Sequence, residues 1–236
     1  MTFDPAPLLI SLKTAATATI ITVFWGIALA RWMVFSGQED NYGFKRKGKE
    51  LVDLIVILPM VLPPTVVGFI LLLIFGKSGV IGRFLYQVGI TIVFSWPATV
   101  ITAAVVALPL MYRTTRGAFE QIDRNALDAA RVLGAPDWYI FLRIILPVSL
   151  PGIGAGIILS FARALGEFGA TIMLAGNIPG KTQTIPVAIF MAVESGQMGT
   201  AYLWVGIVLL ISVSAILALN YWTRLGYKGS NESKGM

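Results

Sequence analysis

The stretch "ALDAARVLGAPDWYIFLRIILP", residues 126–147, is charged and amphipathic, and it interrupts a chain of long apolar runs. Asn125 just before it is a good helix N-cap, and Gly134 suits the left-handed position that ends a helix. Pro136 suits the first turn of a second helix, which Pro147 is predicted to close. The pattern predicts a short helix, a tight turn and a second helix leading into an apolar span.

The first of these two helices is too short to be stable alone. Leu127, Ala130 and Leu133 fall on or near one face, and Ala129 and Ala130 keep the helix slim. One interpretation is a helix lying on the lipid surface, which would need bulkier anchoring side chains. The other is a helix received in a groove of another protein, and the alanines favour it.

Composition places the rest of the chain in a membrane. The 236 residues are 56% hydrophobic and 13% charged, with a mean hydropathy of +0.79, whereas soluble domains carry about 25% charged residues. Apolar runs of bilayer length recur and argue against a soluble enzyme with an apolar core. There is no Cys and no His, which excludes disulfides and metal sites built on those residues.

We expect an all-α integral membrane protein that forms a single transmembrane domain over residues 1–236. Its membrane-embedded core would cover about 8–222, with a cytoplasmic loop at 113–147 and a disordered polar tail at 225–236. The partly apolar segment Ile178–Thr200 is expected to form a re-entrant or surface hairpin buried in protein. The five predicted spans are Leu8–Phe35, Leu51–Phe75, Val88–Tyr112, Val148–Leu174 and Tyr202–Trp222.

The distribution of Lys and Arg predicts the orientation. Of the 18 basic residues, thirteen fall on one side of these spans, four on the other, and Arg163 lies within a span. The basic side is expected to be cytoplasmic, which places the N-terminus outside and the C-terminus, the 36–50 loop and the 126–147 stretch inside. The net charge of +6 is then explained without a nucleic-acid partner.

Two spans contain features beyond apolar filling. Pro63 and Pro64 should kink or break the second span near its middle, either to fit a bundle or to flex beside a pathway. In the fourth span small residues recur every four positions and form one helical ridge, which allows close helix packing or could line a pore. The ridge consists of Gly152, Gly156, Ser160 and Ala164.

Arg163 and Glu167 lie at i and i+4 in the fourth span and can pair on one helix face. Charges inside a membrane are costly and suggest function, although a self-neutralising pair can also fix packing. At about 1.5 Å per residue, Arg163 lies about 20 Å from the cytoplasmic end. That depth is in the outer half of the bilayer, suited to a closed outer gate or the path of an anion.

No catalytic constellation and no metal-ligand cluster occur in the sequence. The phosphate-binding pattern G-x-x-x-x-G-K-[ST] is also absent. If the protein drives uphill transport with ATP, another chain must hold the nucleotide and its Mg²⁺.

Spacing within the opening stretch resembles a known family. Asp128-Ala129-Ala130, three residues, Gly134, nine residues and then residues 144–147 follow the pattern E-A-A, x₃, G, x₉, I-x-L-P. This is similar to the cytoplasmic loop of binding-protein-dependent ABC importer permeases, with Asp128 in place of Glu. The resemblance implies a coupling helix that inserts into a cleft of an ATPase subunit. The implied ATPase-coupling residues are Asp128, Ala129, Ala130, Leu133, Gly134, Pro136, Ile144, Leu146 and Pro147.

A finer resemblance extends over residues 8–222. The segments "LPMVLPPTVVGFILLLIFGKSGVIG" (58–82) and "FARALGEFGATIMLAGNIPGKTQTIPVAI" (161–189) are similar to molybdate permeases. Sulfate permeases share an "ARALGEFG"-like segment, and molybdate and tungstate are not separable by it. A sulfate or other oxyanion importer therefore stays open, as does a self-contained channel or secondary carrier.

The resemblance implies a type I ABC importer permease embedded in lipid. It would work as two copies, with a cytoplasmic ATPase dimer and an external molybdate-binding protein as partners. The implied pathway or gate residues are Pro63, Pro64, Gly152, Gly156, Ser160, Arg163 and Glu167.

Overall fold

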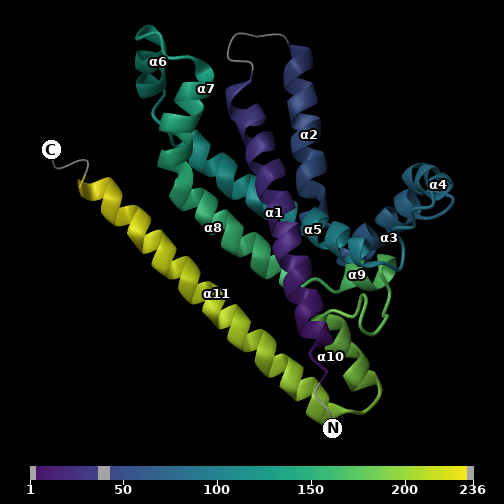
Figure 1. Cartoon of the computed structure of the whole chain (residues 1–236). Helices are drawn as coiled ribbons and strands as arrows, with labels where there is room; N and C mark the ends of the chain where they lie inside the picture. The colour runs from purple at the N-terminus through teal and green to yellow at the C-terminus, as the bar shows by residue number, and fades with distance from the viewer. Residues whose placement is uncertain (1–3, 37–42, 233–236) are drawn as a thin grey trace.

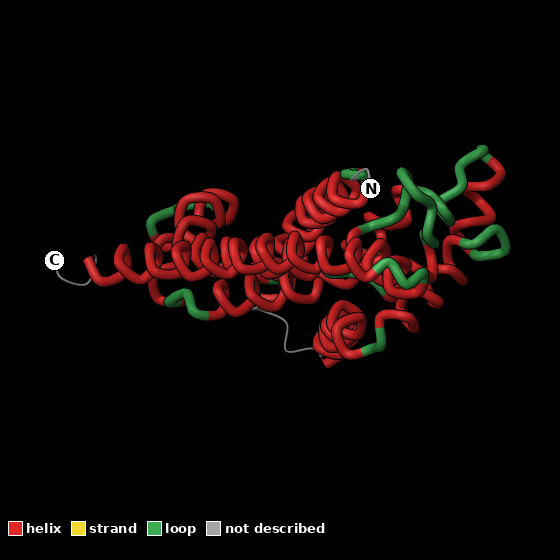
Figure 2. The backbone as a smooth tube through the Cα atoms, turned by 90° about the horizontal axis from the view of Figure 1, so that it is seen from below, coloured by secondary structure: helices red, strands yellow, loops and turns green. Residues whose placement is uncertain are grey.

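The chain folds into helices, as its apolar runs predict. The structure is a computed structural model that describes residues 4–36 and 43–232. These residues form helices joined by loops, without a strand (Figure 2). In chain order the helices are α1 (Ala6–Phe35), α2 (Gly43–Val61), α3 (Pro64–Phe75), α4 (Val80–Gln87), α5 (Trp96–Glu120), α6 (Arg124–Val132), α7 (Asp137–Ile140), the π-helical turn η1 (Phe141–Ile145), α8 (Leu146–Leu165), α9 (Gly169–Leu174), α10 (Ile185–Glu194) and α11 (Met198–Glu232).

Four helical stretches are long and apolar enough to cross a membrane within the described residues. They are Ala6–Phe35, Trp96–Glu120, Asp137–Leu165 and Met198–Tyr221. A bent pair made of α2 and α3 brings the number to five if it is one span. The predicted all-α membrane protein is confirmed, and the predicted five spans match the larger number.

The second span breaks where its prolines predict. α2 ends at Val61, α3 begins at Pro64, and the two helices are bent by 120°. Pro63 adopts ψ 134° because a following proline disfavours the helical conformation at the residue before it. Figure 1 shows α3 turning away from α2 toward α9. There a Cβ on Gly68 would lie 2.7 Å from the Cα of Ala170, so the two helices cross in close contact.

The third span begins later and the fourth span ends earlier than predicted. α5 starts at Trp96, because residues 88–95 turn through positive φ at Gly89 (77°) and Phe94 (60°). The backbone N–H of Phe94 donates to Leu174 at 3.1 Å and holds this turn against the end of α9. α8 ends at Leu165, and the remainder of the predicted fourth span forms the separate helix α9.

Three predicted non-helical segments contain helix. The 36–50 loop contains the start of α2, and the predicted Ile178–Thr200 hairpin contains α10, which begins at Ile185. The Ile185 N–H donates to the hydroxyl of Ser11, which docks α10 beside the start of α1. α11 continues to Glu232 although a disordered tail was predicted from residue 225, because helix extension adds one hydrogen bond per residue. Residues 233–236 lie outside the described residues.

α5 lies at the centre and packs between α1 and α8. At Gly26 of α1 an added Cβ would lie 2.6 Å from the Met111 side chain. The hydroxyl groups of Thr14 and Thr99 lie 2.9 Å apart in a buried hydrogen bond between α1 and α5. Close approach through small residues and hydroxyl pairs between helices are the usual means of packing helices in lipid.

Candidate functional site

The α6–α7 helix pair lies beside the end of α1, at the end of the bundle where α2 also begins (Figure 1). The carboxylate of Asp123 accepts a hydrogen bond from Asn125 N at 2.9 Å and caps α6. The N-cap is therefore Asp123, whereas the sequence analysis predicted Asn125. Asn125 already lies in the first turn, where its N–H needs the acceptor that Asp123 supplies.

The turn between the two helices has the geometry that its glycine predicts. Gly134 adopts φ 82°. Its N–H donates to Arg131 O at 2.9 Å, and Ala135 N–H donates to Ala130 O at 3.1 Å. These two bonds form a Schellman motif, which satisfies the last carbonyls of α6. Pro136 is the N-cap of α7, one residue earlier than its predicted place in the first turn.

Pro147 does not close the second helix, which corrects the sequence prediction. α7, η1 and α8 follow one another without a break from Asp137 to Leu165. The π-turn, in which Leu146 N–H donates to Phe141 O, places Pro147 in the first turn of α8. A proline tolerates that position because it has no N–H to satisfy. One continuous rod therefore runs from the α6–α7 turn into the apolar span.

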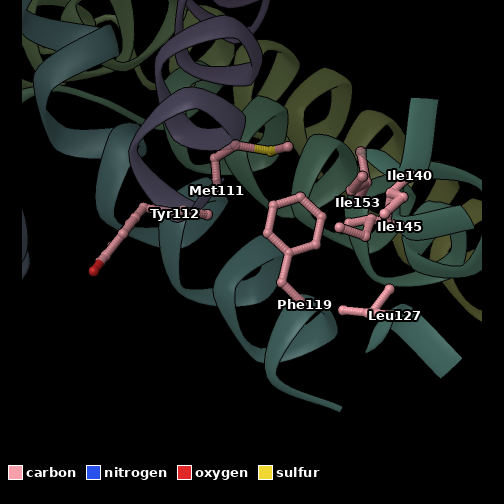
Figure 3. Close-up of a cluster of buried hydrophobic side chains, with 8 residues drawn as sticks. Met111, Tyr112, Phe119, Leu127, Ile140, Ile145 and Ile153 are labelled. Atoms are coloured by element: carbon pink, nitrogen blue, oxygen red, sulfur yellow. The ribbon is translucent and has the colours of Figure 1, made fainter. Parts of the chain in front are cut away.

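The inner face of α6 is anchored in a buried apolar cluster (Figure 3). Leu127 is the fully buried residue of α6, with 2% of its surface exposed. Figure 3 shows the Phe119 ring beside isoleucines of α7, η1 and α8. Ile144 and Leu146, two of the implied coupling residues, pack against the same cluster. Its buried members are Ala30, Met111, Tyr112, Phe119, Leu127, Ile140, Ile145 and Ile153.

The outer face of α6, which we define as Ala129, Val132 and Leu133, is exposed. Val132 and Leu133 expose 88% and 87% of their surface. Leu133 was predicted on the face of Leu127 and Ala130, but as the C-cap residue it points away from them. Neighbouring apolar side chains so exposed outside the spans are consistent with the predicted contact with a partner, which stays a prediction.

Charged side chains beside this face are paired with one another. Arg131 bridges the two helices, with Asp128 at 2.9 Å and Asp137 at 3.4 Å. Asp128 therefore helps to fix the angle between α6 and α7. It also remains largely exposed next to the outer face, where a partner can reach it.

The small-residue ridge of α8 packs against α5. Added Cβ atoms would lie 2.6 Å from Ala118 at Gly152 and 2.3 Å from the Thr114 hydroxyl at Gly156. The Ser160 hydroxyl is buried at 3.5 Å from a carbonyl of α5. This contact corresponds to the packing interpretation of the ridge. A pathway role for Gly152, Gly156 and Ser160 stays a prediction.

Arg163 and Glu167 form the ion pair that their spacing predicts, at 2.9 Å between Nη1 and Oε2. Glu167 exposes 2% of its side chain and Arg163 exposes 32%. The second carboxylate oxygen of Glu167 accepts a hydrogen bond from Ala170 N at 2.7 Å. Glu167 follows the end of α8, so the pair spans the break between α8 and α9.

The structure brings the predicted pathway segments together. A Cβ on Gly169 would lie 2.9 Å from Cβ of Pro64. Pro63 and Pro64, at the break between α2 and α3, therefore lie beside the break between α8 and α9. Glu167 lies two residues before Gly169, so the double proline packs close to the segment that carries Glu167, although about a hundred residues separate them in the sequence.

One polar cluster was not predicted from the sequence. The Asp53 carboxylate of α2 accepts hydrogen bonds from Tyr112 Oη and from Arg116 Nη1 on α5, both at 2.6 Å. Arg116 also pairs with Glu120 at 2.7 Å. The i,i+4 spacing of Arg116 and Glu120 was visible in the sequence, whereas their contact with α2 was not.

Comparison with known proteins shows which family the chain belongs to. Residues 23–224 match the family described as "Binding-protein-dependent transport system inner membrane component". The chain belongs to this family. The permease is 44% identical over 209 residues to the putative molybdenum transport system permease protein YvgM of Bacillus subtilis, covering 87% of this chain and 88% of that protein. It is 43% identical over 213 residues to the molybdenum transport system permease protein ModB of Escherichia coli K12, covering 89% and 90%.

Solved structures support the fold. A structure of the MetNI methionine ABC transporter in inward facing conformations matches with a TM-score of 0.70 at 15% identity, covering 93% of this chain and 94% of the other. A bacterial ABC transporter that imports alginate matches with a TM-score of 0.66 at 17% identity, covering 93% and 79%. The permease therefore has the type I ABC importer fold and is an integral membrane protein.

Proposed function

We propose that the permease is the membrane-spanning subunit of an ATP-driven molybdate importer. The observation that carries this proposal is the 43–44% identity to two molybdenum transport permeases over nearly nine-tenths of the chain. Tungstate is expected to follow the same route because the two oxyanions are nearly equal in size and charge.

The assembly that we propose has two copies of the permease, two cytoplasmic ABC ATPase subunits and an external molybdate-binding protein. ATP and Mg²⁺ bind to the ATPase, which hydrolyses the nucleotide. The exposed outer face of α6, with Val132 and Leu133, supports docking to the ATPase. We propose accordingly that the α6–α7 pair and the C-terminus lie in the cytoplasm and the N-terminus outside, as the distribution of Lys and Arg predicts.

The movement would be transmitted by the continuous helix α7–η1–α8 and by the buried apolar cluster around Phe119. ATP binding closes the ATPase dimer and moves α6. Because α7, η1 and α8 are continuous, that movement reaches the fourth span directly. The buried contact of Leu127 with the cluster around Phe119 carries it to α5 as well. The two helices then switch the pathway between inward-open and outward-open states.

A second candidate substrate is sulfate. The permease is 34% identical over 217 residues to a probable sulfate transport system permease protein of Chlorokybus atmophyticus, covering 89% of this chain and 73% of that protein. Sulfate is a smaller tetrahedral dianion, so the same architecture could admit it.

Reconstitution with the partner proteins tests this function. Proteoliposomes holding the permease, its ATPase and its binding protein should accumulate radiolabelled molybdate only when ATP is supplied. Excess tungstate should compete strongly and excess sulfate weakly. Equal competition by sulfate would replace molybdate with a broader oxyanion substrate. Uptake by the permease alone, without ATPase, would instead indicate a channel or secondary carrier.

A further inference from the structure

Small side chains surround Arg163 at its end of α8. Its neighbours Ala162 and Gly166 are exposed and small, and Leu159, one turn earlier, is half-buried. The exposed Val148 lies on the same side of the helix but about four turns away, toward the other end of α8. A charged side chain on a lipid-facing surface would be costly. The end of α8 that carries Arg163 is therefore expected to face protein or water on this side.

The two members of the ion pair are held unequally. Glu167 is 2% exposed, and its Oε1 is fixed by Ala170 N at 2.7 Å. Its Oε2 is buried and accepts no hydrogen bond among the described residues, although the Arg163 guanidinium lies 2.9 Å away. The contact of Arg163 with Oε2 is therefore an ion pair without good hydrogen-bond geometry, in contrast to the contact of Ala170 with Oε1. Arg163, with 32% of its side chain exposed, can leave this contact while Glu167 stays in place.

The pair also lies where two spans are broken. Gly169 contacts Pro64, so the α8–α9 break meets the α2–α3 break beside Glu167. Non-helical backbone at membrane depth is tolerated where it is buried in protein or lines a water-filled cavity. Two such breaks side by side, next to a movable arginine, are the arrangement expected where an ion passes.

We propose that Arg163 contacts the oxyanion in the transmembrane path, and that the oxyanion displaces Glu167 from the guanidinium as it passes. This inference rests on the proposed function. A planar guanidinium can offer two parallel N–H donors to two oxygens of a tetrahedral oxyanion. In the assembly that we propose, the two copies would offer two arginines to a dianion.

Glu167 gives this site its reversibility. In the empty site it neutralises Arg163, so no unpaired charge is left within the span. When the oxyanion takes its place, Glu167 becomes a buried carboxylate without its cation, which is costly. Its return to Arg163 expels the oxyanion. A transported ion must bind weakly enough to leave, and a competing carboxylate supplies that weakness.

The test uses the complete complex in proteoliposomes with variants of both residues. Arg163→Gln should lower ATP-driven molybdate uptake by about 10- to 100-fold, the loss expected for a charge-assisted hydrogen bond. ATP hydrolysis stimulated by the loaded binding protein should persist in this variant. The double variant Arg163→Gln/Glu167→Gln should be equally impaired in uptake. Glu167→Gln, which keeps the arginine and an acceptor for Ala170 N, should lose less than Arg163→Gln.

A purely structural pair gives different results. Recovery of uptake in the double variant, or equal losses in the two single variants, would overturn the inference. Arg83→Gln on α4 is the matched control, because it removes an exposed arginine elsewhere. A loss as large as that of Arg163→Gln there would also overturn the inference, by assigning the effect to net charge.

Two further results complete the test. If Arg163→Gln does not assemble, Arg163→Lys keeps the charge but not the two-pronged contact, and uptake equal to that of the unmodified complex would refute the bidentate contact. If the unmodified complex takes up no molybdate, the proposed function fails and not the inference about Arg163.

Discussion

Replacing Leu127 with alanine should loosen α6 from the spans that it is proposed to move. Leu127 is 2% exposed and is the fully buried residue of that helix. A buried Leu→Ala change costs about 2–5 kcal/mol, which combines lost burial with the cavity that remains. Because α6 has nine residues and cannot persist alone, most of that cost should fall on its docking to the cluster.

Leu133→Ala is the matched control, since it makes the same chemical change six residues away. Leu133 is 87% exposed, so its loss should change the stability of the isolated permease by less than about 0.5 kcal/mol. It should instead weaken the complex with the ATPase. A contact residue that contributes about 1–2 kcal/mol gives about a 5- to 30-fold loss of affinity.

Two assays separate these outcomes. Thermal unfolding of the detergent-solubilised permease should show a lower midpoint for Leu127→Ala and an unchanged one for Leu133→Ala. In the assembled complex, Leu127→Ala should lower the molybdate transported per ATP hydrolysed, because α6 moves without the cluster. The reasoning is refuted if both variants unfold like the unmodified permease, or if Leu133→Ala alone lowers the midpoint.

Substitutions at three further positions follow from the geometry. Gly134→Val should destabilise the α6–α7 turn by about 1–2 kcal/mol because φ is 82°, and Gly134→Asn should destabilise it less. The distorted turn should show as weaker co-purification with the ATPase for Gly134→Val than for Gly134→Asn. Gly156→Leu should prevent α8 from packing on α5, since even a Cβ would lie 2.3 Å from the Thr114 hydroxyl; a normal yield of folded protein would contradict this. Asp53→Asn should weaken the contact with Arg116, and at this partly exposed site a loss of about 1 kcal/mol in unfolding free energy is expected.

The sequence predicted features that depend on a few neighbouring residues. Gly134 could be placed in the left-handed region because a glycine after a short amphipathic helix is the usual C′ residue. The break at Pro63 and Pro64 follows from proline stereochemistry alone. The Arg163–Glu167 pair required only helical spacing.

Features set by contacts between distant segments were missed. α8 ends at Leu165 without a proline, at a place where the Glu167 carboxylate accepts the N–H of Ala170 in the first turn of α9 and Gly68 packs against Ala170. The partners Asp53 and Arg116 lie 63 positions apart, and neither residue indicates the other.

Other errors concern choices that local rules leave open. Asp123 and Asn125 are both good caps, and only the geometry chooses between them. A proline such as Pro147 usually ends a helix, because it has no N–H to donate. Here the preceding π-turn places Pro147 where the helix needs no such donor.

The packing also indicates where movement of α6 would be absorbed. Leu127 joins α6 to the cluster around Phe119, and Gly156 packs closely against the Thr114 and Met111 side chains of α5, so α5, α6 and α8 should move as one body. α2 meets that body through the polar contact of Asp53 and through Val56 and Ile57, which pack against the same cluster. α3 and α9 follow backbone breaks, which can hinge. The relative motion should therefore concentrate where those breaks meet at Pro64, beside the ion pair proposed to contact the oxyanion.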